Sequence, residues 1–367
     1  MLMGAAMAGC APVPAKHPRP DGIAFDEAVE RRAIVQVLTA AAEWQLAHPS
    51  EHPRWDWAQS PFWIALAAFA PLSDDPPRYF AAVRRNGEEL RWRPGPRPLC
   101  ADDHAVTQSY FMLHRVQPDL AMIQPALQTF DAIMLFPFDE SLEFVSWEKT
   151  WRQWVWCDAL FMSPPALALA ANATGDRRYL DFMDRMWWKT TDYLYDKQEH
   201  LYYRDSRFFD QRTPSGRKVF WSRGNGWVLA GLARVLQEMP ADYPQRPRYA
   251  ALFREMAAKV VTLQHGDGCW RSSLLDPEVM PRPETSGTAF YVYALAWGVN
   301  QGLLDRATVE PAIRRGWTAL VRAVHPDGKL GYVQRIDDQP GETSADGTEI
   351  YGVGALVLAG LELLRSA

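Results

Sequence analysis

The sequence predicts an all-α fold, an (α/α)6 barrel built from six helical hairpins. Apolar residues recur with the 3.6-residue period of a helix from Phe25 to the C-terminus, whereas the alternating β-branched runs of strands are almost absent. Two concentric rings of helices would bury nearly all of each inner helix and one face of each outer helix. Residues 164–173 and 352–364 are almost uniformly apolar, as inner helices should be.

Each predicted helix carries an amphipathic or apolar stripe. In residues 176–194 the stripe passes through Tyr179, Met183 and Trp187, and Asp176 provides a helix cap at its start. The predicted helices are 26–48, 60–71, 77–87, 103–115, 118–134, 158–173, 176–194, 225–238, 245–264, 287–302, 306–324 and 349–365. Polar turns followed by an aromatic residue recur at 196–203, 265–270 and 325–332, which is typical of a repeated hairpin unit.

The chain divides into a short leader and one catalytic domain. Residues 1–20 comprise a small, apolar start that ends before Cys10 and a Pro-rich tether, which resembles a bacterial lipoprotein signal without its basic region. This pattern predicts a lipid anchor at Cys10 and a periplasmic or membrane-anchored lipoprotein; the alternative is an ordinary terminus. No composition break divides residues 21–367, so we expect a single domain.

Composition excludes several functional classes. The formal charge is −5, with 39 basic and 44 acidic residues and no basic run, so nucleic acid is not an expected partner. The four cysteines show no C-x-x-C spacing, and neither a metal site nor a cofactor is indicated. The 16 Trp, 13 Tyr and 16 Phe residues suit packing against the C–H faces of sugar rings, although most are expected in the core.

Three polar segments interrupt the helical pattern and contain the candidate site residues. The first holds Asp102, Asp103 and His104 at a predicted helix start, where adjacent carboxylates are either caps or site residues. A metal-binding pair is disfavoured, because no further acid follows at helical spacing. We expect Asp102 to cap the helix and Asp103 to face a substrate.

The second segment, residues 151–165, places Asp158 after Trp154 and Trp156 at the start of an apolar helix. Asp158 could simply cap that helix. However, aromatic neighbours remove water from a carboxyl group and raise its pKa, as a general acid requires.

The third segment, residues 220–227, surrounds a Gly-Asn-Gly turn with Trp221, Arg223 and Trp227. Either Arg223 pairs locally, or the segment forms a sugar platform whose guanidinium binds a carboxylate.

At these residues the chain resembles a known enzyme group. The motifs WCDALFMSPP, WSRGNGW, ADDHAV with Gln108, ATGDRRYLDFM and PETSGTAFYVYALAWG resemble glycoside hydrolase families 88 and 105, and family 105 more closely. The resemblance implies an (α/α)6 barrel and an exo-acting hydrolase that releases a 4,5-unsaturated uronic acid from acidic, lyase-generated oligosaccharides. It implies that Asp158 is the catalytic acid, with Asp102 or Asp103 as the second acid. Trp221, Arg223 and Trp227 would line the sugar, beside Trp156 and His104.

Two departures from the family pattern concern substrate contacts. The His that often precedes the sugar-lining segment is replaced by HLYYRDS, so that His200, Tyr203 or Arg204 could take its place, and Lys149 is out of register. Two other functions fit the same residues: an exo-glycosidase that uses two carboxylates by displacement, and a non-catalytic glycan-binding lipoprotein.

Overall fold

The computed structural model describes residues 24–366. The predicted leader at residues 1–20 and the lipid anchor at Cys10 lie outside the described residues and stay predictions. Twelve helices in residues 24–366 are ten residues or longer. They are α1 (Arg31–Ala47), α2 (Ser60–Phe69), α3 (Pro76–Glu89), α5 (Thr107–Val116), α6 (Gln124–Ile133), α9 (Pro164–Thr174), α10 (Arg178–Leu194), α11 (Ser222–Glu238), α12 (Arg246–Thr262), α13 (Thr285–Asn300), α14 (Arg306–Arg322) and α15 (Ile350–Leu364).

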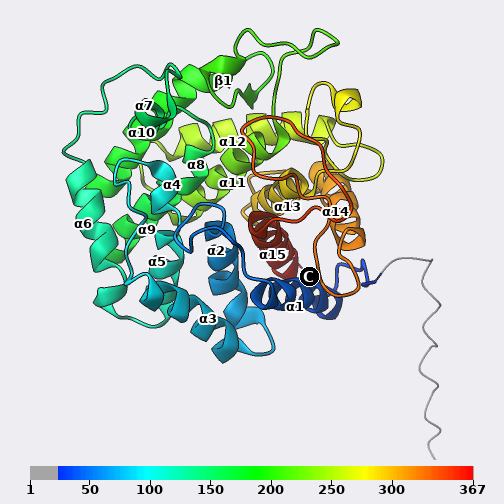
Figure 1. Ribbon diagram of the computed structural model, residues 1–367, viewed down its shortest axis with the longest axis horizontal. Helices are drawn as coiled ribbons and strands as arrows, with labels where there is room; N and C mark the ends of the chain where they lie inside the picture. Colours follow the sequence, from blue (N-terminus) through cyan, green and yellow to red (C-terminus); the bar gives the residue numbers. More distant parts are fainter. Residues whose placement is uncertain (1–23, 367) are drawn as a thin grey trace, which may run out of the picture.

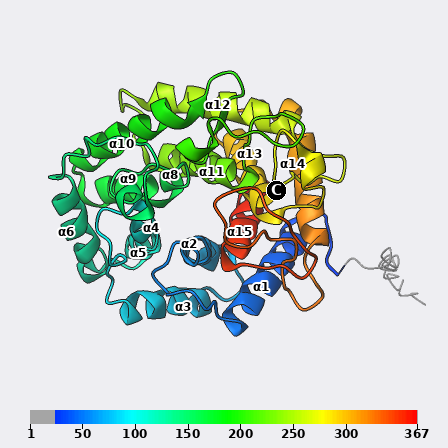
Figure 2. The ribbon, with the colours of Figure 1, turned by 45° about the horizontal axis from the view of Figure 1, so that its top comes forward.

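These helices alternate between an outer and an inner ring, which confirms the (α/α)6 barrel. Helices α2, α5, α9, α11, α13 and α15 form the inner ring, and α15 closes it by packing against both α13 and α2. Helices α1, α3, α6, α10, α12 and α14 surround them (Figures 1 and 2).

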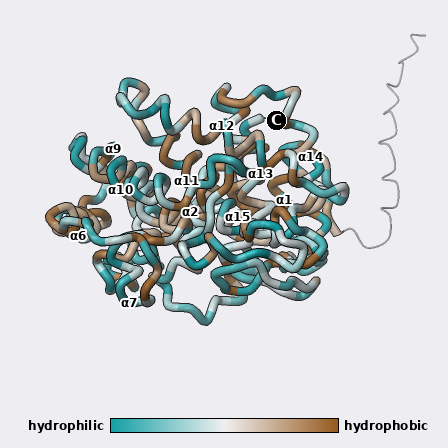
Figure 3. Tube along the Cα trace, turned by 90° about the horizontal axis from the view of Figure 1, so that it is seen from above, coloured by the Kyte–Doolittle hydropathy of each residue, from teal (hydrophilic) through white to brown (hydrophobic). Residues whose placement is uncertain are grey.

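Burial follows this arrangement. Every residue of α15 from Ile350 to Leu363 is buried, and so is almost all of α13. The outer helix α10 instead buries one stripe that includes Tyr179, Met183 and Trp187. Hydrophilic residues predominate in many of the peripheral segments (Figure 3). Within the described residues, no helix combines the length and apolar composition needed to cross a membrane.

Two predicted helices are each split into a short and a long one. The predicted helix at 103–115 becomes α4 (Ala101–His104) and α5, and the predicted helix at 158–173 becomes α8 (Ala159–Met162) and α9. Pro164 and Pro165 start α9, where proline is tolerated because the first helical N–H groups have no partner within the helix. The polar turn after α10 forms a hairpin of two-residue strands, β1 (Tyr195–Asp196) and β2 (Leu201–Tyr202), with Tyr195 opposite Tyr202.

The connections between helices differ in length at the two ends of the barrel. Segments that lead from an outer to an inner helix are long: 48–59, 90–106, 134–163, 195–221, 263–284 and 323–349. They include the short helices α4, α7 (Trp147–Thr150) and α8. Because neighbouring helices run in opposite directions, these segments all gather at the end where the inner helices begin. The three polar segments of the sequence therefore lie at one end of the barrel.

Gly231 allows α11 to pack closely against α8. A Cβ atom at Gly231 would lie 2.5 Å from the carbonyl oxygen of Leu160, which is backbone and cannot rotate away. We expect Gly231→Ala to lower the free energy of unfolding by about 1–3 kcal/mol, as overpacking does, although alanine favours a helix. Thermal denaturation tests this, with Gly266→Ala as control, since a Cβ there meets nothing within 4 Å. Equal stability of the two variants would contradict the close approach.

Candidate active site

A cavity of about 420 Å³ lies among the long segments at this end of the barrel. Of the predicted site residues, it brings together Asp102, Trp156, Asp158 and Arg204. The residues that line it are Asp56, Trp57, Arg97, Asp102, Trp147, Trp151, Trp156, Asp158, Met162, Arg204, Ile336, Asp337 and Asp338.

Asp158 stands directly before α8 and is 8% exposed. Its side chain makes no capping hydrogen bond, so the carboxyl group is not committed to the helix. The Cys157 thiol donates to its Oδ2 at 3.4 Å, and the Arg204 Nε lies 3.5 Å from the same oxygen. Burial raises the pKa of Asp158 above its usual value, and Arg204 opposes that rise. A buried carboxyl group with a raised pKa is suited to proton transfer.

The two adjacent acids do not have their expected positions, and the N-cap of α4 is Cys100. Asp102 lines the cavity, and burial followed by the charge of Asp158 raises its pKa to about 8. Asp103 is fully buried outside the cavity and accepts hydrogen bonds from the Arg97 backbone N–H at 2.6 Å and from Nη2 at 2.6 Å. Successive residues of a helix point about 100° apart, so only one acid faces the cavity. Asp103 is the one held by Arg97.

Arg204 is the cation available to a ligand in this cavity. It is 9% exposed and lies between Asp158 and the fully buried Asp205, to which it donates at 2.8 Å. Its Nε has no hydrogen-bond partner among the described residues. The other cation that lines the cavity, Arg97, already donates two side-chain hydrogen bonds to Asp103, from Nε and Nη2. A carboxylate that enters the cavity would therefore find its donor at Arg204.

A chain of alternating charges links Asp158 to Asp338, and both residues line the cavity. Asp205 accepts hydrogen bonds from both Arg204 and Arg207 at 2.8 Å, and Arg207 donates to Asp338 at 2.6 Å. Although burial opposes it, the Arg207 and Arg204 hydrogen bonds keep the pKa of Asp205 below its usual value. Asp205 thus stays ionised and fixes both guanidinium groups.

The residues of the predicted sugar platform do not line this cavity. Arg223 is fully buried and donates to the backbone carbonyls of Gln334 at 2.9 Å and Arg335 at 3.0 Å. Trp221 packs against its guanidinium and donates to the Gln334 side chain at 2.8 Å. Trp227 lies in the core. The segment is therefore a clamp on residues 334–337, and the expected sugar platform is not seen.

His104 also has an internal role. It is fully buried, with ring nitrogens 2.7 Å from the Ser163 Oγ and the Pro98 carbonyl oxygen. Burial lowers the pKa of His104 to about 4, which leaves the ring uncharged at neutral pH. His104 joins α4 to the start of α9 and does not reach the cavity.

Among the three residues that could replace the missing His, only Arg204 lines the cavity. Tyr203 donates its hydroxyl to Asp196 at 3.1 Å, and His200 lies 3.7 Å from Glu255. Among the described residues, no group of three or more His, Cys, Asp or Glu side chains could hold a metal ion.

The Glycosyl Hydrolase Family 88 profile matches residues 31–367. The chain belongs to glycosyl hydrolase family 88. It is 41% identical to an unsaturated 3S-rhamnoglycuronyl hydrolase of Formosa agariphila over 89% of both chains. It is 34% identical to a protein of the same name from Alteromonas sp. strain LOR, over 89% of this chain and 84% of the relative. A solved structure named a polysaccharide lyase superposes with a TM-score of 0.83 at 32% identity and covers 92% of this chain and 98% of its own.

Several residues that line the 420 Å³ cavity were not predicted from the sequence. Asp56, Trp57, Arg97 and the segment 336–338 lie in long connections without a periodic pattern. Trp147 and Trp151 could have been predicted as site residues, because they belong to the Trp-rich stretch before Asp158. The rest could be found only from the packing of the connections over the inner ring.

The raised pKa of Asp102 predicts how stability depends on pH. A carboxyl group whose pKa is about 8 when folded and about 4 when unfolded keeps its proton in the folded state between these values. The free energy of unfolding therefore falls as pH rises from 4 to 8, by at most about 1.4 kcal/mol per pH unit. We expect Asp102→Asn to remove this contribution, which denaturation at several pH values would detect.

Asp103→Asn is the matched control for that experiment. It breaks the contact with Arg97, so we expect a loss of about 1.5–3 kcal/mol at neutral pH. An Asp102→Asn protein with the wild-type pH profile would show that Asp102 is ionised in the cavity.

Proposed function

We propose that this enzyme removes a 4,5-unsaturated uronyl residue from the non-reducing end of a short oligosaccharide in which rhamnose follows the uronate. The observation that carries this proposal is the pair Asp102 and Asp158, both with a raised pKa, beside the unpartnered Nε of Arg204. The two relatives named unsaturated 3S-rhamnoglycuronyl hydrolase support the class of substrate.

The shape of the cavity supports exo action. Trp147, Trp151 and Trp156 offer flat aromatic surfaces, and the 336–338 segment forms part of the wall. A cavity of about 420 Å³ has room for a terminal sugar.

The chemistry follows from the vinyl ether of an unsaturated uronate. The uronate carboxylate binds Arg204 and competes with Asp158 for the guanidinium, which raises the pKa of Asp158 further. Asp158 donates its proton to C4, and positive charge develops on the ring oxygen and C5. Water adds to C5 and gives a proton to the ionised Asp158. The resulting hemiketal opens, and the aglycone leaves as an alcohol.

Asp102 has a separate role in this proposal. Because its pKa is about 8, it is protonated at neutral pH and can donate a hydrogen bond to a sugar hydroxyl. No covalent intermediate forms, so the carboxylate separation rules for retaining and inverting glycosidases do not apply.

Ultraviolet absorbance separates this function from the others. Hydration consumes the C4–C5 double bond and its absorbance before the aglycone leaves, whereas displacement at the glycosidic bond by two carboxylates releases the aglycone first and loses the absorbance only afterwards, when the freed sugar ring opens to an enol that becomes a ketone. A lyase would create absorbance, and a glycan-binding protein would change nothing.

The proton donor can be tested by an isosteric substitution. Asp158→Asn keeps the shape but cannot donate the proton, so we expect kcat to fall by about 10²- to 10⁴-fold without a loss of fold. The measurement is the decay of absorbance of an unsaturated rhamnoglycuronyl disaccharide. Asp102→Asn is the comparison and should lose less, because an amide can still donate a hydrogen bond. The reverse order would assign the proton donor to Asp102.

The carboxylate contact can be tested at Arg204. Arg204→Lys keeps the charge but loses the planar set of donors, so we expect kcat/KM on the uronate to fall about 10- to 100-fold, as for a hydrogen bond to a charged group. The methyl ester of the same substrate serves as control and should lose much less. Equal losses on both substrates would show that Arg204 does not bind the carboxylate.

A further inference from the structure

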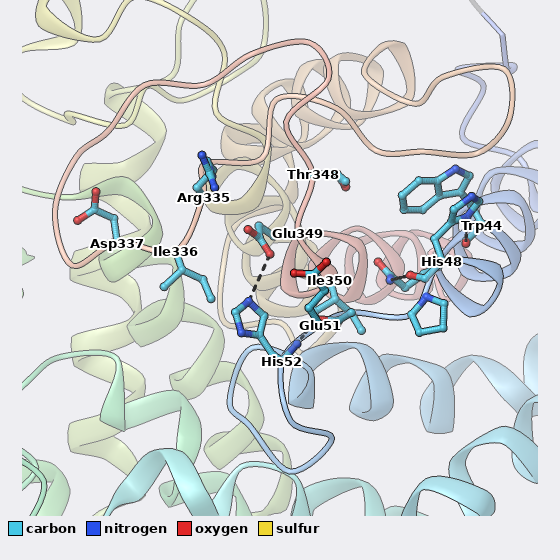
Figure 4. Close-up of a pocket in the computed structure, with 13 residues that line it drawn as sticks. Trp44, His48, Glu51, His52, Arg335, Ile336, Asp337, Thr348, Glu349 and Ile350 are labelled. Carbon is cyan, nitrogen blue, oxygen red and sulfur yellow. Dashed lines mark hydrogen bonds and ion pairs between the residues drawn. The ribbon is translucent and has the colours of Figure 1, made fainter.

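A second cavity, of about 710 Å³, adjoins the catalytic cavity. Ile336 and Asp337 line both cavities, so this short segment is their common wall. The remaining lining residues come from the C-terminal part of α1, the segment after it, and the segment before α15 (Figure 4). None of them has a role in the proton transfer described above.

One end of this second cavity carries a flat aromatic surface. The rings of Trp44 and His48 stack with centroids 4.2 Å apart and an interplanar angle of 16°. The indole Nε1 donates to Asp327 at 3.1 Å, and the His48 Nδ1 lies 2.8 Å from the Trp44 carbonyl oxygen. Figure 4 shows this stack at the opposite side of the cavity from Ile336 and Asp337. The surface is held in a fixed orientation at the end remote from the catalytic site.

Polar groups lie between the aromatic surface and the common wall. His52 and Glu349 approach each other at 4.0 Å, with Glu51 and Thr348 nearby in the same cavity (Figure 4). The Thr348 hydroxyl is buried and has no hydrogen-bond partner among the described residues. The polar side chains that a ligand in this cavity can reach are therefore Glu51, which is exposed, and His52 and Glu349, which are half-buried.

The charges of the lining residues favour an uncharged ligand. Glu51, Asp337 and Glu349 bring three carboxyl groups, against the single guanidinium of Arg335. Such a lining repels a second uronate or a sulfate, whereas sugar hydroxyls can donate to carboxylates and accept from His52. Burial also raises the pKa of Glu349.

We propose that this second cavity is an aglycone site in which an uncharged sugar, on the reducing side of the cleaved linkage, stacks on the exposed ring of His48, which Trp44 supports from its other face. The proposal rests on the proposed function, since the uronate would occupy the catalytic cavity across Ile336 and Asp337. The remote position of the stack means that only an oligosaccharide longer than a disaccharide would reach it.

The test compares three substrates with the same unsaturated uronyl-rhamnose end. One is the disaccharide, one is extended at the reducing end by two uncharged sugars, and one is extended by a uronate and a rhamnose. For the wild-type enzyme we expect the uncharged extension to lower KM about five- to tenfold relative to the disaccharide, with little change in kcat. The uronate-bearing extension should gain less.

Variants at the stack should remove this advantage. In Trp44→Ala the ratio of KM values for disaccharide and uncharged extension should fall to about one. His48→Ala, at an exposed ring, should reduce the ratio even if Trp44→Ala does not fold. His114→Ala is the matched control, because its Nδ1 also lies near a backbone carbonyl, at 2.9 Å, at the end of α5 and away from both cavities. It should keep the wild-type ratio.

Several outcomes would overturn the inference. A wild-type enzyme that consumes the disaccharide but gains nothing from the uncharged extension has no aglycone site here. A greater gain from the uronate-bearing extension would contradict the uncharged ligand. Loss of the gain in His114→Ala as well would show that the effect does not arise at the stack. Failure to consume any of the three chromophores would instead overturn the proposed function, on which this inference depends.

Discussion

The inner ring closes because α15, near the end of the chain, packs between α13 and α2. The six inner helices are largely buried, and polar side chains within the ring are paired, as Arg234 is with Gln108 at 2.8 Å. The alternating directions of the helices bring every long connection to one end of the barrel. The catalytic cavity, the clamp around Arg223 and the second cavity all belong to this single layer of connections.

Within that layer, two buried acids are paired with arginine side chains, and two others have raised pKa values. Asp103 and Asp205 are fully buried and each binds at least one arginine, which stabilises a charge that would otherwise be costly. Asp102 and Asp158 are left with less compensation, and their pKa values rise. Burial therefore accompanies ion pairing in Asp103 and Asp205, and a raised pKa in Asp102 and Asp158. Arg204 contacts both types, because it lies beside Asp158 and is fixed by Asp205.

The Arg223 clamp connects the core to both cavities. Its guanidinium holds the carbonyls of Gln334 and Arg335, and the next two residues form the common wall. Asp338, one residue further, is held by Arg207 and so by the charge chain that reaches Asp158. A motif that resembles a sugar-binding segment in the sequence thus positions a loop that lines both cavities.

The sequence by itself determined the helices, their division into inner and outer rings, and the family. Helical periodicity depends on residues close together in the chain, and the distribution of apolar residues around a helix indicates whether one face or every face is buried. It also identified Asp158, because Trp154 and Trp156 are neighbours in the chain. Only the tertiary structure decided between Asp102 and Asp103, since the choice depends on where the guanidinium of Arg97 lies. It alone showed the partners of Arg223, which are more than 100 residues away in the chain. Contacts at that separation depend on how the connections pack over the closed ring, and no local pattern of residues encodes them.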